Sequence, residues 1–260
     1  DGACLGCHNT GGYALRKHHN HEPTGDAARC VNCHMPEKTY MVVDPRRDHS
    51  FRIPRPDLSD AIGAPNACNN CHTDETAAWA AAQIDVWTDN KPAKGFQRHG
   101  AALYLARQGL PQARNALLGV VNDDNQSAIA RASAIDALGA WLDQEVAQTI
   151  TENLSDGSPL VRRAAVQVLA SAPEQVRADL LPALLQDPVR EVRSAAVVGL
   201  AGLPPGTLAP SAASAYTQAL ADHRATLRLD ADRPEAQVSL GVLLTQLRDI
   251  EGAEAAYRQA

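Results

Sequence analysis

Two cysteines, two spacer residues and a histidine occur in the same order three times before residue 75, as "CLGCH", "CVNCH" and "CNNCH". All six cysteines of the chain belong to these motifs: Cys4, Cys7, Cys30, Cys33, Cys68 and Cys71. Each motif ends in a histidine, His8, His34 or His72. Two thiols with this spacing span the two vinyl groups of a porphyrin, and the adjacent imidazole reaches its iron. The sequence therefore predicts three covalently bound c-type haems with these histidines as proximal ligands.

Two other uses of paired cysteines explain the pattern less well. A structural zinc site needs two C-x-x-C pairs around one ion, and three pairs divide poorly into such sites. Zinc also does not require a histidine after every second cysteine. A thioredoxin-like redox pair occurs singly in a βαβ context, which this sequence lacks. Zinc or disulfide chemistry is thus the alternative to haem attachment.

The far side of each iron needs a second ligand, and spare histidines gather between the haem motifs. An isolated histidine is normally a solvated surface residue, but "RKHHNHEP" holds three within four positions. We expect at least two of the following to be distal ligands: His18, His19, His21 and His49. His99, on a predicted repeat helix, is a weaker candidate, and we interpret His223 as a surface residue. Met35 and Met41 are assigned to packing rather than to iron.

The region 1–90 provides roughly 30 residues per haem, which is too little protein for an ordinary hydrophobic core. We therefore expect the porphyrins to form the core, wrapped by loops and short helices. Four arginines surround His49, and either haem propionates or solvent would be their partners: Arg46, Arg47, Arg52 and Arg55. The stretch "TDETAAWAAAQIDVW" predicts a helix capped by Thr73 or Asp74, with Trp79 against a haem, and "DNKPAKG" predicts a linker.

An internal repeat follows the linker. The segments "RASAIDALG", "RRAAVQVLA" and "RSAAVVGLA" align on Arg131, Arg162 and Arg193, which are 31 residues apart. Apolar residues recur three, four and seven positions after each arginine, on one helical face. A polar turn with Asp124, Asp156 or Asp187 precedes each segment. These stacked helix–turn–helix units resemble HEAT repeats over about residues 96 to 203.

The last segment, "RPEAQVSLGVLLTQLRDIEGAEAAYRQA", resembles a tetratricopeptide repeat. Its small and large packing positions are Leu240, Gly241, Leu244, Ala253, Tyr257 and Ala260. The chain stops at the last of these without a polar cap, so we expect the array to continue. The fold class predicted is mainly α: a trihaem domain at 1–90, HEAT-like repeats at 91–205 and a TPR-like repeat at 206–260. The helices serve as scaffold or as a docking surface.

Taken together, "CVNCHMP", "TYMVVDPRRDHSFRIPRPDLS", "PNACNNCH" and the repeat tail resemble bacterial multihaem c-type cytochromes with C-terminal tetratricopeptide repeats. The resemblance implies export to the periplasm or cell surface, a role in respiratory electron transfer and a longer chain with further haem motifs upstream. The chain opens at Asp1 with no signal-peptide pattern, and we interpret it as a mature or excerpted piece.

Three functions fit this resemblance. We favour an electron carrier, because all three motifs end in histidine and enough spare histidines exist to close every iron. A multihaem oxidoreductase acting on a small nitrogen or sulfur compound would need one open iron. A conducting filament would need subunits that assemble. Expected partners are other redox proteins, haem subunits, a protein on the repeats or further copies of the chain. The net charge of −6 argues against nucleic acid, and no apolar run approaches the roughly 20 residues of a membrane helix.

Overall fold

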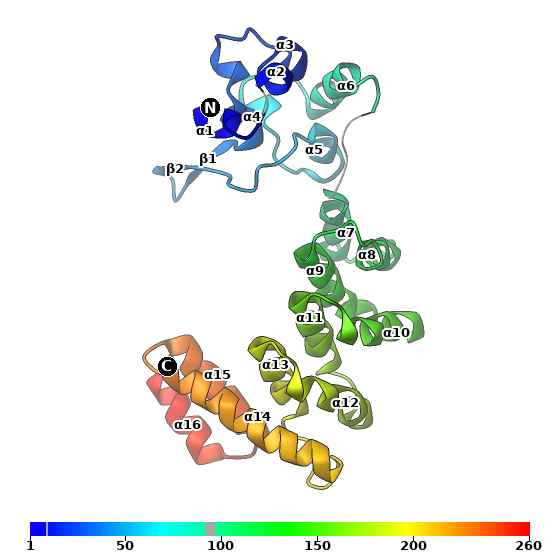
Figure 1. The fold of residues 1–260 in the computed structure, drawn as a ribbon, viewed down its shortest axis with the longest axis vertical. Coiled ribbons are helices and arrows are strands. Elements are labelled where there is room, and N and C mark those ends of the chain that lie inside the picture. The colour runs from blue at the N-terminus through cyan, green and yellow to red at the C-terminus, as the bar shows by residue number, and fades with distance from the viewer. Residues whose placement is uncertain (9, 92–96) are drawn as a thin grey trace. The chain divides into compact units, whose positions relative to one another are not determined.

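The fold is mainly helical in a computed structural model that describes residues 1–8, 10–91 and 97–260 (Figure 1). Sixteen α-helices lie in these ranges, with several 3-10 turns and one pair of strands. The chain forms two compact units, Asp1–Ala101 and Ala102–Ala260, which are described separately below. Most of the predicted linker "DNKPAKG" lies outside the described residues. No helix among those described is long and apolar enough to cross a membrane.

The N-terminal unit is built from short elements. Its helices are α1 (Gly2–Leu5), α2 (Thr10–Tyr13), α3 (Arg16–His19), α4 (Cys30–His34), α5 (Pro56–Ile62) and α6 (Ala77–Trp87), with 3-10 turns at Asp26–Ala28 and Cys68–Asn70. Strands β1 (Glu37–Tyr40) and β2 (Asp44–Arg47) pair antiparallel, with Glu37 opposite Arg47. Of the residues described in this unit, Pro56 and Ala80 alone are fully buried. Its side chains therefore do not form a hydrophobic core among themselves.

Two local features of this unit differ from the sequence prediction. The N-cap of α6 is Thr76, not Thr73 or Asp74, and its hydroxyl accepts a hydrogen bond from the Trp79 amide at 3.1 Å. Residues 72–75 instead form a turn, closed by the Glu75 amide and the His72 carbonyl at 3.3 Å. The β1–β2 hairpin was not predicted at all. Its connection puts Met41 and Val42 at positive φ without the glycine or asparagine that signals such turns.

The second unit is a succession of longer helices that begins within α7 (Arg98–Arg107), the helix that carries His99. It continues through α8 (Ala113–Val121), α9 (Ala128–Leu138), α10 (Gln144–Glu152), α11 (Pro159–Leu169), α12 (Glu174–Leu180), α13 (Arg190–Leu200), α14 (Pro210–Leu229), α15 (Pro234–Gln246) and α16 (Ile250–Gln259). Proline at Pro182 turns the end of the α12 segment into a 3-10 helix, Leu181–Gln186.

The predicted apolar face of the 31-residue repeat is confirmed. Helix α11 packs between α9 and α13. The residues four positions after each repeat arginine, Ile135, Val166 and Val197, are completely buried. The leucines seven positions after each arginine are Leu138, Leu169 and Leu200, and they join the same core. Burial of these side chains is the main force that stacks the repeats.

A ladder of ion pairs links successive repeats. Arg131 binds the carboxylate of Asp156 at 2.7 Å, and Arg162 binds that of Asp187 through two nitrogens at 2.7 and 2.9 Å. In the first turn Asp123, rather than the expected Asp124, accepts hydrogen bonds from Asn125 and Gln126. The aspartates Asp156 and Asp187 of the predicted turns thus also form ion pairs with the arginine of the preceding repeat.

Helices α15 and α16 pack closely at the small and large packing positions predicted from the sequence, Gly241 and Tyr257. A Cβ atom added to Gly241 would lie 2.5 Å from Cε1 of Tyr257, so no larger residue fits there without movement. Ala253 and Leu244 are buried in the same hairpin. In α14, His223 is not the surface residue expected, because its Nδ1 atom is buried with no hydrogen-bond partner among the described residues. Burial lowers the pKa of this imidazole.

Candidate haem-binding site

All three C-x-x-C-H motifs fold as a single helical turn. The His8 amide donates to the Cys4 carbonyl, and the His72 amide donates to the Cys68 carbonyl, both at 2.9 Å. The middle motif is helix α4 itself. Residues at positions i, i+3 and i+4 lie on one face of such a turn, so each motif presents two thiols and an imidazole together. The six thiols form no disulfides.

Three of the candidate ligand histidines are held in the same tautomer by backbone carbonyls. Nδ1 of His34 lies 2.8 Å from the Arg52 carbonyl, and Nδ1 of His49 lies 2.8 Å from the Arg47 carbonyl. Nδ1 of His21 contacts the carbonyl of His19. A carbonyl oxygen can only accept, so each Nδ1 carries the hydrogen and each Nε2 keeps its lone pair. Metal-binding histidines are characteristically oriented by such a bond from the nitrogen that does not bind the metal.

The rings of His18 and His34 form the first imidazole pair. Their centroids lie 6.1 Å apart and their planes are inclined by 13°. A metal–imidazole bond is about 2 Å long, so two rings that bind one metal from opposite sides have centroids about 6 Å apart. Burial, followed by the neighbouring His34 and His19, lowers the pKa of His18. A lowered pKa favours the neutral imidazole, which is the form that binds metals.

The rings of His21 and His72 form a second pair with nearly the same separation, 6.2 Å, and an angle of 39°. Helix α6 flanks this pair with two tryptophans. Trp87 meets the His21 ring edge-on at 5.9 Å, and the Trp79 ring lies 5.0 Å from that of His72. The eight-residue spacing puts both indoles on one side of α6. The sequence analysis predicted that Trp79 packs near a haem, but it made no prediction for Trp87.

The remaining histidines have other neighbours. The ring of Tyr13 contacts His8 at 5.3 Å and His18 at 5.2 Å, edge-on in both cases. Nδ1 of His19 accepts a hydrogen bond from the His21 amide at 3.2 Å. His19 therefore helps to shape the turn that presents His21. His49 is held by the Arg47 carbonyl described above, with its Nε2 available.

The second and third motifs lie close to one another. Burial raises the pKa of the Cys33 thiol, and the nearby thiols of Cys68, Cys71 and Cys30 raise it further. Burial also raises the pKa of Cys68. Cys33 and Cys68 are 35 residues apart in sequence, and the fold brings their motifs together. The sequence analysis did not predict this proximity. Both thiols remain protonated at neutral pH.

Arg47 anchors the end of the middle motif. One of its guanidinium nitrogens, Nη1, donates to the carbonyls of Val31 and Met35, at 3.3 and 3.1 Å, and to the Asn32 side chain at 3.2 Å. Both carbonyl groups lie in the last turn of α4 or at its C-cap, a position that favours a cation. Nothing in the sequence around Arg47 predicted that it would bond the end of α4.

The other arginines that we considered as propionate partners contact carboxylates of this chain. Arg46 binds Asp44, Arg52 binds Asp48 and Arg55 binds Asp57, at 2.6, 2.9 and 2.6 Å respectively. The first two pairs are largely exposed and contribute little to stability. Arg55 is the most buried of the set.

The donor set fits a porphyrin iron better than a bare ion. Over the described ranges, no three His, Cys, Asp or Glu side chains gather as a bare metal ion would need. Two imidazole pairs have the centroid separation expected for ligation of one iron from opposite sides, and each has a C-x-x-C turn beside one of its rings. These residues would be able to hold a c-type haem.

Part of the second unit matches a known repeat family. Residues 123–201 match the family model of HEAT repeats. The match confirms the helical-repeat resemblance over those residues and agrees with the stacking of α9, α11 and α13. No curated protein and no solved structure matches this chain. Residues 123–201 are thus the part of the chain that resembles a known repeat family.

Proposed function

We propose that residues 1–90 hold three c-type haems and that the chain transfers electrons in an exported respiratory multihaem cytochrome. The thioether bonds would come from the six motif cysteines. His8, His34 and His72 would be the proximal ligands. The near-absence of buried side chains in this unit supports the proposal, because the bound groups would supply the missing core.

The observation that carries the proposal is the pair of imidazole separations, 6.1 Å for His18–His34 and 6.2 Å for His21–His72. We assign His18 as the distal ligand opposite His34, and His21 as the distal ligand opposite His72. His49 has an available Nε2 and stays a candidate for the His8 iron. His19 also stays a candidate, although its Nδ1 is already engaged by the His21 amide.

A c-type haem, when bound, supplies an iron that gains and loses one electron. The residues of this chain would set the conditions for that change. The Nδ1 hydrogen bonds of His34 and His21 hold the rings in place and increase the basicity of Nε2. The two indoles of α6 shield the second pair from water. Imidazoles on both faces leave no position for a substrate, which favours a carrier over an enzyme.

The HEAT repeats and the α14–α16 helices would act as scaffold and as a docking surface for a redox partner, a haem subunit or another copy of the chain. Attachment of c-type haem takes place outside the cytoplasm, so we place the protein in the periplasm or at the cell surface. These assignments rest on the motif chemistry and on the family resemblance.

One observation favours a second candidate function, a multihaem oxidoreductase. The ring next to His8 is that of Tyr13, not an imidazole. If His49 does not close the His8 iron, that iron would be open to a small nitrogen or sulfur compound. Tyr13 would then lie near the reacting molecule.

Expression with a haem-attachment system, a covalent haem stain and electron paramagnetic resonance would test both functions. We expect three covalent haems and three low-spin ferric signals that nitrite and hydroxylamine do not alter. A high-spin signal that shifts with either compound would favour the oxidoreductase. Absence of covalent haem would refute both functions.

A further inference from the structure

The Arg–Asp ladder of the HEAT repeats ends at Arg193. In Arg162, Nε and Nη2 hold the two oxygens of Asp187, while Nη1 donates to the Asp156 carbonyl at 2.8 Å. Arg131 likewise binds a carboxylate 25 residues further on, that of Asp156. Arg131 and Arg162 thus each bond a carboxylate and at least one backbone carbonyl.

Arg193 bonds backbone carbonyls but no carboxylate of the described residues. Its Nη1 donates to the carbonyls of Asp187 and Pro188 at 2.7 and 3.2 Å, as in the preceding repeat. The residue 25 positions later is Gln218, which lies within α14 instead of in a turn. Within the described part of the chain, no carboxylate lies within ion-pair distance of Arg193. Its Nε and Nη2 therefore present an unfilled bidentate donor.

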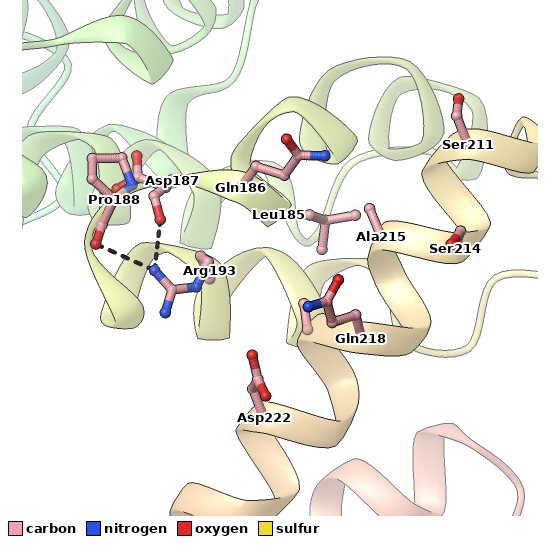
Figure 2. Close-up of a pocket in the computed structure, with 11 residues that line it drawn as sticks. Leu185, Gln186, Asp187, Pro188, Arg193, Ser211, Ser214, Ala215, Gln218 and Asp222 are labelled. Carbon is pink, nitrogen blue, oxygen red and sulfur yellow. Dashed lines mark hydrogen bonds between the residues drawn. The ribbon is translucent and has the colours of Figure 1, made fainter.

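These donors lie beside a pocket of about 500 Å³ between the turn at Asp187 and α14 (Figure 2). On the α14 side, four polar residues line it at helical spacing: Ser211, Ser214, Gln218 and Asp222. Hydroxyl and amide groups are suitable secondary donors for an anion held by the guanidinium. The carboxylate of Asp222 lies at one end of this row, so a second negative charge on the ligand would be repelled there.

We propose that this pocket binds a carboxylate ligand that carries a single negative charge, with a cationic or neutral group beside it. The carboxylate takes the place that Asp156 and Asp187 occupy on Arg131 and Arg162. Gln218 donates to it, and the group beside it faces Asp222. The ligand is a free small acid or an acidic side chain of a peptide. The site is independent of the haem proposal.

The test is calorimetry of the haem-loaded full chain with 4-aminobutyrate, butyrate and succinate. The same titration is repeated with a peptide that contains adjacent glutamate and lysine. Tighter binding of the peptide would identify an acidic side chain as the ligand, and tighter binding of the small acids would identify a free acid. We expect millimolar or tighter binding, with 4-aminobutyrate bound better than succinate. Arg193→Gln should weaken binding by about tenfold or more, since it removes a charged hydrogen-bond donor. Arg190→Gln removes the same charge from an exposed position of α13 and should leave binding unchanged.

A reciprocal variant keeps the test independent of any folding defect in Arg193→Gln. Gln218→Glu adds a carboxylate to the pocket wall with almost no change in shape. It should compete with the ligand, weaken binding by about tenfold and raise the melting temperature. Asp222→Asn should remove the preference for 4-aminobutyrate over succinate. Absence of binding for every probe, or equal binding by the original chain and Arg193→Gln, would overturn the proposal.

Discussion

The imidazole rings of His18 and His34 lie with centroids 6.1 Å apart and with planes only 13° from parallel. Helix α3 supplies the first ring and helix α4 the second, and the Arg52 carbonyl fixes the second ring through its Nδ1. This relationship supports the proposal that His18 is the distal ligand for the middle motif. Its neighbour His19, adjacent in sequence, contacts the His21 amide instead.

Replacing His18 should therefore open one iron. In His18→Ala the haem on Cys30 and Cys33 loses its distal nitrogen, so we expect one of three low-spin ferric signals to become high-spin. The matched control is Lys17→Ala, which changes the exposed residue of α3 next to His18 and should retain three low-spin signals. Electron paramagnetic resonance of the two variants makes the comparison. Three unchanged low-spin signals in His18→Ala would contradict the assignment.

If His21 and His72 bind a haem as proposed, the indole of Trp79 should influence that haem. Its ring lies 5.0 Å from that of His72, so Trp79→Leu frees this imidazole to rotate from its 39° angle to His21. The angle between axial imidazoles affects the splitting of the iron d orbitals, and we expect one set of g-values to shift while the others stay. Trp141→Leu makes the same change in the second unit and should leave all g-values unaltered.

Asp187 should make the stability of the repeats depend on acid pH. Burial raises the pKa of Asp187, but hydrogen bonds from Arg162 and the Val189 amide, with the charges of Arg162 and Arg193, outweigh it and lower the pKa. A lowered folded-state pKa contributes stability above the unfolded value of about 3.9, and this is lost as pH falls through the folded-state pKa. Urea unfolding followed by circular dichroism from neutral to acid pH would show the loss.

The same carboxylate provides a direct test of the ladder at neutral pH. Asp187→Asn leaves the nearly buried guanidinium of Arg162 without its charge partner, which should cost about 3 kcal/mol of unfolding free energy. It should also flatten the acid dependence. The exposed Asp136→Asn is the control and should change stability by less than about 0.5 kcal/mol. Equal effects of the two substitutions would argue against the ladder.

Gly241 should not tolerate a methyl group. Alanine normally stabilises a helix interior by about 1 kcal/mol relative to glycine. Here the new Cβ would lie 2.5 Å from Tyr257, and overpacking of this kind costs about 1–3 kcal/mol. Gly241→Ala should therefore destabilise the α15–α16 hairpin. Gly119→Ala, in α8 with nothing within 4 Å of the added atom, should be neutral or stabilising in the same thermal unfolding measurement.

The sequence alone determined the features that depend on spacing along the chain. C-x-x-C-H places two thiols and an imidazole on one helical turn, so His34 could be named as a proximal ligand without a structure. The 31-residue repeat put Ile135, Val166 and Val197 on one apolar face, and all three are buried. Both inferences work because neighbours on a helix are fixed by its period of 3.6 residues.

Only the tertiary structure decided which residues distant in sequence meet. It paired His18 with His34 and His21 with His72, while the sequence left four equivalent candidates. It also gave Arg47 its place at the end of α4, and left Arg193 without the carboxylate that its two counterparts hold. Spacing does not encode such contacts, because they depend on how loops and helices fold back on one another.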